Sequence, residues 1–216
     1  RCLSHINVIV PHVLELDHWT SESWLYMEYG GSALVDVVLA GTLSDDCVHS
    51  WCTQILAAVQ YLHVRSIAHM DLKLDNMTVT TRGVIKIIDL GLAHVYRDGE
   101  PDVSTTTLRG SESYAAPEIL LKRAFSPYAA DVWSLGVCLF GLCAGRFPFS
   151  TAHDSDPRFA ALAAWQGHDA CTTSIRRLVE HFRERGGSIP SRVDDWCETI
   201  ERMLRVEPTE RVRLQD

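Results

Sequence analysis

Four polar side chains between residues 71 and 89 have the types and the order that phosphoryl transfer requires. Asp71 is a carboxylate that can orient an incoming hydroxyl and accept its proton, and Lys73 is a cation that can stabilise charge on the moving phosphoryl group. Asn76 and Asp89 supply an amide oxygen and a second carboxylate, which suit Mg²⁺. Each residue alone would be weak evidence, but together they predict a phosphoryl-transfer site.

The motifs around these residues resemble those of the protein kinase family. Residues 69–76 read H-M-D-L-K-L-D-N and are followed by D-L-G at 89–91, similar to the kinase catalytic loop and metal-binding motif. Further along, residues 110–118 resemble G-T-x-x-Y-x-A-P-E, residues 131–136 resemble D-x-W-S-x-G, and residues 208–211 resemble the final P-x-x-R. The ordered set identifies the chain as a member of this family.

The resemblance implies a role for each residue of the catalytic set. Asp71 would be the catalytic base, and Asn76 and Asp89 would hold Mg²⁺. Ser111 would hydrogen-bond near Asp71 and Lys73, as in Ser/Thr kinases. The Lys at position 73 also favours Ser/Thr over Tyr substrates, so we expect a Ser/Thr protein kinase that uses ATP.

The resemblance also places the adenine of ATP. Residues 25–30 look like the last strand of the small lobe running into the hinge, where backbone groups of Glu28 and Gly30 would contact adenine. Met27 would be the gatekeeper residue. Thr78 falls where an aliphatic side chain usually packs beneath the adenine, which puts the nucleotide affinity in question.

Three further residues are expected to anchor the activation segment and the catalytic loop. By resemblance, Glu118 and Arg211 would form a buried ion pair although they are far apart in the sequence. Loss of one partner of such a pair is costly because the other charge is left uncompensated. Asp131 would accept backbone N–H groups of the catalytic loop and fix its shape.

Regulation is expected to depart from the family pattern. Thr107 lies four residues before Ser111, where many kinases carry an activating phosphothreonine, and it is the candidate phosphosite. The arginine that would pair with the phosphate is replaced by Met70, whose thioether cannot make charge-assisted bonds. Only Lys86 or Arg109 remain as candidate partners, so we expect no phosphate-on-arginine switch; the alternative is that residues 104–107 form a plain polar loop.

Substrate choice is expected to favour basic peptides mildly. Asp75 matches a position where kinases that prefer basic substrates often carry an acid. Gly141 replaces the second acid that those kinases use. The partner is therefore expected to be a protein with a Ser or Thr acceptor and nearby basic residues.

The pattern of apolar residues predicts a short β region followed by a mostly helical lobe, an α+β fold of the protein kinase kind. The N-terminal region, residues 1–29, would hold two strands and the start of the hinge, and residues 30–216 would form the C-lobe, with the catalytic loop at 69–76 and the activation segment at 89–118. Strands are expected at 8–16, 24–28, 77–80 and 84–88; helices are expected from Ser44 and at 117–122, 129–144, 156–166, 173–185 and 192–204, with a long loop at 89–115.

The chain is expected to be an excerpt of a longer protein. It contains no G-x-G-x-x-G before Gly30 and no V-A-I-K strand, so the lysine that grips the ATP phosphates would lie upstream of Arg1 or not exist. We therefore expect these 216 residues alone to bind ATP weakly and to lack measurable activity.

Composition narrows the class of partner and the compartment. The net charge of −8 argues against nucleic acid and against an anionic membrane surface. The longest apolar stretch, residues 132–145, falls short of the about 20 residues needed to span a bilayer and is expected to be a buried helix. Seven scattered cysteines without metal-site spacing indicate reduced thiols and an intracellular location, cytoplasmic or nuclear.

Two alternative functions stay open at this point. A pseudokinase or scaffold would keep the fold without turnover, although all four catalytic and metal roles are filled here. A small-molecule phosphotransferase of the aminoglycoside/choline type shares an H-x-D-x-x-x-x-N loop but lacks the A-P-E segment and its Arg partner. Within protein kinases, residues 142–149 and the C-lobe look most similar to the calcium/calmodulin-dependent and AMP-activated/checkpoint group.

Overall fold

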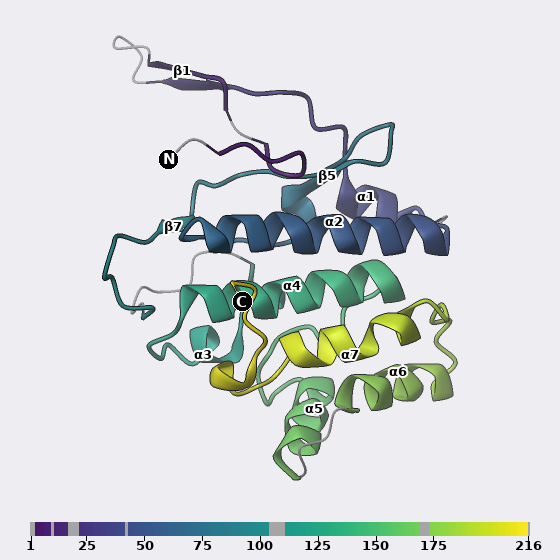
Figure 1. Ribbon diagram of the computed structural model, residues 1–216. Coiled ribbons are helices and arrows are strands. Elements are labelled where there is room, and N and C mark those ends of the chain that lie inside the picture. The colour runs from purple at the N-terminus through teal and green to yellow at the C-terminus, as the bar shows by residue number, and fades with distance from the viewer. Residues whose placement is uncertain are drawn as a thin grey trace.

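The computed structural model describes residues 3–9, 11–16, 22–41, 43–103, 111–168 and 173–215 (Figure 1). The helices are α1 (Leu34–Leu39), α2 (Asp45–Val64), α3 (Pro117–Leu120), α4 (Pro127–Ala144), α5 (Pro157–His168), α6 (Ser174–Glu184) and α7 (Val193–Met203), with 3₁₀ turns at Leu74–Asn76, Glu112–Tyr114 and Pro208–Glu210. The strands are β1 (Val13–Leu16), β2 (Ser23–Tyr26), β3 (Ser32–Ala33), β4 (Ile67–Ala68), β5 (Met77–Val79), β6 (Ile85–Ile87) and β7 (His94–Val95). This content confirms the expected α+β, mostly helical fold.

The core is built around α4, which lies between α2 on one side and α7 on the other (Figure 1). Its first turn is capped by Ser126, whose Oγ accepts a hydrogen bond from Ala129 N at 3.0 Å, and Pro127 occupies a position where no N–H partner is needed. Trp133 and Phe140 are fully buried. The helix is long and apolar enough to cross a bilayer, but 83% of that stretch is buried inside the fold, as expected for a core helix.

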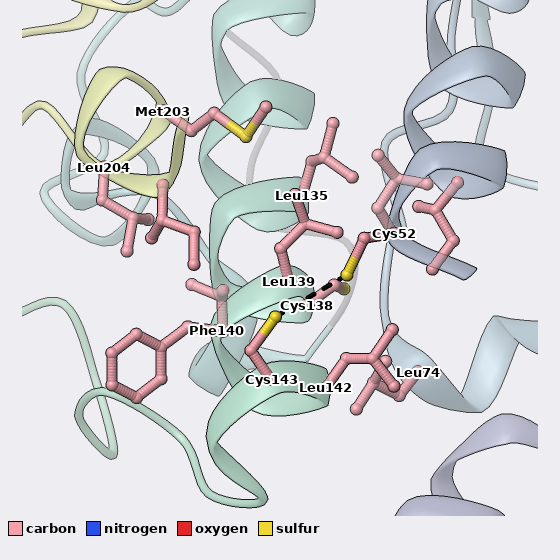
Figure 2. Packing of buried hydrophobic residues seen from close by; sticks show 14 of the residues in the cluster. Cys52, Leu74, Leu135, Cys138, Leu139, Phe140, Leu142, Cys143, Met203 and Leu204 are labelled. Carbon is pink, nitrogen blue, oxygen red and sulfur yellow. Dashed lines mark hydrogen bonds between the residues drawn. The ribbon is translucent and has the colours of Figure 1, made fainter. Parts of the chain in front are cut away.

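The contact between α2 and α4 is apolar and rich in sulfur. Figure 2 shows Cys52 of α2 facing Cys143 of α4, with the two Sγ atoms 3.7 Å apart, and Leu135, Leu139 and Leu142 nearby. All five cysteines among the described residues are free thiols, and only Cys47 is exposed. Burial of such side chains is the main favourable term in holding the two helices together.

Helix α2 begins where the sequence predicts. Ser44 Oγ accepts a hydrogen bond from Cys47 N at 3.3 Å, and the acids Asp45 and Asp46 lie in the first turn, where the helix dipole favours negative charge. Ile55, Val59 and Leu62 recur at helical spacing and are completely buried, so this face of the helix packs on the core.

A three-stranded antiparallel sheet, in the order β3–β5–β6, carries the segment that follows the catalytic loop. The strands β5 and β6 were expected at 77–80 and 84–88, but β3 and α1 were not, because a two-residue strand and a six-residue helix carry little periodicity. Gly31 enters β3 with φ of +100°, and a Cβ there would lie 2.1 Å from Val79 O. That close approach requires glycine.

The predicted loop at 89–115 is interrupted by regular structure. Strand β7 pairs antiparallel with β4, matching Ala68 to His94 and Ile67 to Val95. Both strands have two residues, so their pairing depends on tertiary contacts that no local pattern reveals. The pairing attaches the start of the activation segment to the chain just before the catalytic loop.

The N-terminal region contributes to two separate pieces of β structure: a hairpin of its own, and a short segment beside β6. The antiparallel β1–β2 hairpin is shorter than the strands predicted at 8–16 and 24–28. Residues 7–9 instead attach to β6, through Ile9 N to Ile87 O at 2.9 Å and Ile87 N to Asn7 O at 2.8 Å. The boundary at residue 29 stays a prediction.

Candidate active site

The catalytic loop brings three predicted residues into one hydrogen-bonded group. The Lys73 ammonium lies 2.8 Å from Asp71 Oδ2, and the amide Nδ2 of Asn76 donates to the same oxygen at 2.8 Å. Asn76 Nδ2 also donates to the backbone O of Asp71 at 2.9 Å. The 3₁₀ turn at 74–76 makes these contacts possible because it folds Asn76 back towards Asp71.

Asp89 is held beside this group by its neighbour Ile88. The backbone N–H of Ile88 donates to Asn76 O at 3.0 Å, and the His69 ring nitrogen Nε2 lies 3.1 Å from Ile88 O. Asp89 itself adopts φ of +64°, a left-handed conformation that a non-glycine residue holds only when its surroundings enforce it. The second predicted metal ligand thus lies next to the catalytic loop.

The oxygens that these residues leave free fit a hard cation. Because Asn76 uses its NH₂ group to bind Asp71, its carbonyl oxygen faces no donor in the described part of the chain. Asp89 accepts one bond, from Gly91 N at 3.0 Å to Oδ1, which leaves Oδ2. One carboxylate and one amide oxygen, completed by phosphate oxygens and water, is a donor set that Mg²⁺ uses.

Asp131 of α4 fixes the shape of the catalytic loop through hydrogen bonds to its backbone. Its Oδ2 accepts the N–H of His69 at 2.6 Å, and its Oδ1 accepts the N–H of Met70 at 2.8 Å. Met70 has φ of +66°, so these bonds hold a conformation that is locally unfavourable. Both expected backbone contacts of Asp131 are therefore present.

His63 of α2 is a member of this site that the sequence analysis missed. It is 2% exposed, and its Nε2 lies 3.0 Å from Asp131 Oδ2. Its Nδ1 has no hydrogen-bond partner among the described residues. The position follows Val59 and Leu62 on the buried face of α2, so periodicity could indicate burial but not the contact with Asp131.

The predicted anchor of the activation segment is also present. Arg211 Nη1 and Nη2 donate to the two carboxylate oxygens of Glu118 at 2.6 and 2.8 Å, and both side chains are buried. The guanidinium lies over the Trp133 ring, 5.0 Å from its centroid. The pair joins α3 to the C-terminal 3₁₀ turn and thereby fixes the end of the activation segment.

Ser111 lies near Asp71. It lines a small pocket with Met70, Asp71 and Tyr114, and within the described ranges its hydroxyl hydrogen-bonds neither Asp71 nor Lys73. Tyr114 Oη instead accepts the N–H of Leu74 at 3.4 Å, and burial raises the pKa of this phenol. The hydrogen bond expected for Ser111 near Asp71 and Lys73 stays a prediction.

The hinge residues lie beside the small sheet. Met27 lines an apolar pocket together with Ile9, Leu25 and residues 88–91, so it faces the region of Asp89. The Glu28 carboxylate forms an ion pair with Lys86 Nζ at 2.6 Å, so Lys86 already has an acidic partner. Thr107 and Arg109 lie outside the described residues.

Thr78 lies directly against the hinge. A Cβ on Gly30 would lie 2.4 Å from Thr78 Oγ1, so the two residues pack in contact. The Thr78 hydroxyl is buried and has no hydrogen-bond partner within the described part of the chain. A buried unpaired hydroxyl is uncommon and destabilising.

Comparison with known proteins agrees with this geometry. A family model described as the protein kinase domain matches residues 1–216. The chain is 31% identical over 219 residues to "Probable serine/threonine-protein kinase MARK-A" of Dictyostelium discoideum, covering 100% of the chain and 18% of that protein. It is 36% identical over 203 residues to "CBL-interacting protein kinase 5" of Oryza sativa subsp. japonica, covering 92% of the chain and 43% of that protein.

The fold, the site and these similarities together define a protein kinase domain. The chain belongs to the protein kinase family, and relatives of both the MARK and the CBL-interacting types are named as Ser/Thr kinases. That agrees with the group indicated by the sequence. The chain spans less than half the length of the relatives compared above.

Proposed function

We propose that the protein transfers the γ-phosphoryl group of ATP to Ser and Thr hydroxyls of protein substrates. The observation that carries the proposal is the convergence of Lys73 and Asn76 on one carboxylate oxygen of Asp71, each at 2.8 Å. That arrangement fixes a base, a cation and an amide oxygen within one site. The named activity of the relatives supports the same conclusion.

The proposed chemistry assigns one task to each residue. Asp71 orients the substrate hydroxyl and accepts its proton, and Lys73 offsets negative charge on the transferring group. Asn76 and Asp89 would hold Mg²⁺, which would supply positive charge to offset that of the phosphate groups. Asp131 keeps the loop in shape through its bonds to the N–H groups of His69 and Met70.

Adenine recognition is assigned to the hinge. Backbone groups of Glu28 and Gly30 would bind the base, Met27 would limit the depth of the pocket, and Thr78 would lie beneath the ring. The contact of Thr78 with Gly30 supports the shared location of these residues. The phosphate-gripping loop and lysine, which the described residues do not supply, would be needed for full ATP affinity.

The substrate is proposed to be a protein segment with a Ser or Thr acceptor and a basic residue nearby. Asp75 is exposed and lies in the catalytic loop beside Asn76, so its carboxylate can meet a cationic side chain. The position of the second acid found in kinases that prefer basic substrates is occupied by Gly141, which has no side chain. A Cβ at this position would contact Leu74 of the catalytic loop and Phe147. The proposed location is intracellular, on the basis of free thiols among the described cysteines.

A kinase assay with point variants tests the proposal. The full-length protein is incubated with Mg-ATP and Ser/Thr peptides, and Asp71→Asn and Asp89→Asn are compared with the wild type. We expect each variant to lose turnover by at least about a thousandfold, in line with the loss of a catalytic group, while the thermal unfolding temperature stays close to that of the wild type.

The matched control is Asp154→Asn, which removes one negative charge from an exposed position between α4 and α5. It should leave turnover unchanged. Undiminished activity in Asp89→Asn would show that the metal assignment is wrong. A wild-type protein without activity that still binds Mg-ATP would favour a pseudokinase or scaffold.

A further inference from the structure

The Asp102 carboxylate joins two parts of the molecule that are far apart in the sequence. The hydroxyl of Tyr96 donates a hydrogen bond to its Oδ1, and Ser126 Oγ donates to its Oδ2 at 2.5 Å. Tyr96 and Asp102 belong to the activation segment, whereas Ser126 is the N-cap of α4. Each carboxylate oxygen therefore has its own hydroxyl donor.

An aromatic stack reinforces the same junction. The rings of Tyr96 and Tyr128 are nearly parallel, with an interplanar angle of 13° and a centroid distance of 4.3 Å. Tyr96 is 6% exposed, and burial raises the pKa of its phenol, so the group remains a neutral donor. Tyr128 belongs to the first turn of α4, two residues after Ser126.

The junction continues to the catalytic loop through direct contacts. The edge of Tyr128 meets the His63 ring at a centroid distance of 4.8 Å, and His63 Nε2 lies 3.0 Å from Asp131 Oδ2. Asp131 lies one helical turn after Tyr128 and holds the N–H groups of His69 and Met70. The activation segment and the catalytic loop thus bind the same short stretch of α4.

We propose that Asp102 is a positioning residue for catalysis, which clamps the activation segment to the first turn of α4 and so keeps the catalytic loop in its working shape. The proposal rests on the kinase activity proposed above. Asp102 acts through Tyr96, Ser126 and α4 and does not touch the reacting atoms. The negative charge in this contact comes from the Asp102 side chain itself, so the contact forms without phosphorylation of the activation segment.

Two further observations agree with a clamp that does not depend on phosphate. Met70 cannot pair with a phosphate, and Lys86 is engaged with Glu28. In the turn between Tyr96 and Asp102, the Glu100 carboxylate contacts the His94 ring at 3.0 Å and accepts the N–H of Arg97 at 2.8 Å. The Glu100 carboxylate therefore holds the turn that precedes Asp102, and no phosphate is needed for these contacts.

The test compares Asp102→Ala and Tyr96→Phe with the double variant in the full-length protein. Tyr96→Phe keeps the aromatic stack and removes only the hydroxyl. Two readouts are taken: amide hydrogen exchange of residues 94–103, which includes the bond from Tyr96 N to Ser66 O at 2.9 Å, and the separate kcat and KM values for peptide phosphorylation.

We expect a moderate effect, because Asp102 is exposed and its bonds compete with water. Asp102→Ala should raise exchange at 94–103 at least about fivefold and lower kcat about three- to tenfold, with KM for ATP changed less than about twofold. Since Asp102 and Tyr96 share one bond, the double variant should be little worse than Asp102→Ala. Asp154→Asn, which removes one acidic charge from an exposed position outside this junction, is the control and should change neither readout.

The two readouts separate the clamp from the proposed function. Unchanged exchange in Asp102→Ala, or faster exchange with a wild-type kcat, would overturn the proposal. Fully additive effects of Asp102→Ala and Tyr96→Phe would also overturn it, because the two residues would then act independently. A wild-type protein without kinase activity would count against the proposed function and so against a role in catalysis, while exchange would still report whether the contact exists. If Asp102→Ala failed to fold, Tyr96→Phe alone should still raise exchange and lower kcat.

Discussion

Glu118 and Arg211, which are 93 residues apart, form a buried bidentate ion pair that connects α3 to the C-terminal end of the helical lobe. The guanidinium also donates to the carbonyl oxygens of Arg205 at 2.8 Å and Ala129 at 3.0 Å. Its donors are thus distributed over three segments. Removal of the guanidinium would leave the buried Glu118 carboxylate and the carbonyl oxygens of Arg205 and Ala129 without this donor.

Arg211→Met should therefore destabilise the protein strongly. We expect the free energy of unfolding to fall by about 3–5 kcal/mol, because Glu118 is left as an uncompensated buried charge. Urea titration measures the change. Arg213→Met, on the exposed segment nearby, should stay within about 0.5 kcal/mol of the wild type; a loss below about 1 kcal/mol for Arg211→Met would contradict the assignment.

Thr78→Val should stabilise the protein. The substitution keeps the shape of the side chain and removes a buried hydroxyl that has no partner among the described residues, so we expect a gain of about 1 kcal/mol. If Thr78 lies beneath adenine, calorimetry should also show tighter ATP binding. Thr80→Val is the contrasting control: Thr80 Oγ1 accepts the N–H of Val84 at 3.1 Å, so its loss should be destabilising.

Stability should fall in alkaline solution. The hydrogen bond with Cys143 and burial raise the pKa of Cys52 above its ordinary value of 9.0, and burial together with the negative charge of Asp75 raises that of Cys138. Below about pH 9 these thiols are protonated in both states and their contribution is fully present. Above that pH the unfolded thiols ionise and the folded ones do not, so the free energy of unfolding should fall by roughly 1.4 kcal/mol per pH unit for each group.

Urea titrations between pH 7 and pH 10.5 measure this slope. Cys138→Ala should show a shallower decline above pH 9 than the wild type, even though its stability at pH 7 is lower. An equal slope in the two proteins would mean that Cys138 ionises normally in the fold.

Thr107 should matter little for activity. Because Met70 replaces the usual phosphate partner, Thr107→Ala in the active full-length protein should change kcat less than about threefold, roughly 0.6 kcal/mol of barrier. Met70→Arg should restore a partner and make the rate depend more on Thr107. A loss of a hundredfold or more from Thr107→Ala alone would show that another basic residue binds a phosphate there.

Peptide choice should depend on Asp75. A peptide array should show a mild preference for Arg or Lys near the acceptor, and Asp75→Asn should reduce that preference while a neutral peptide is phosphorylated at a similar rate. Gly141→Glu should strengthen it by adding the missing acid. Strong selection for acidic residues around the acceptor would refute the proposal.

The sequence by itself determined the class of the molecule and most of its chemistry. The spacing of Asp71, Lys73 and Asn76 within one loop is short, so their convergence follows from local geometry and could be predicted. The helices α2 and α4 could be placed for the same reason, since their apolar periodicity and, for α2, the cap at Ser44 are local signals.

Only the tertiary structure decided which distant residues meet. Strands β4 and β7 have two residues each, and their pairing depends on the packing of α2 and α4 rather than on propensity. The contact of His63 with Asp131 and the bond from Ser126 to Asp102 join segments 68 and 24 residues apart. A hydrogen bond between distant side chains leaves no periodic trace in the sequence, because it depends on how whole elements pack and not on the residues next to it in the chain.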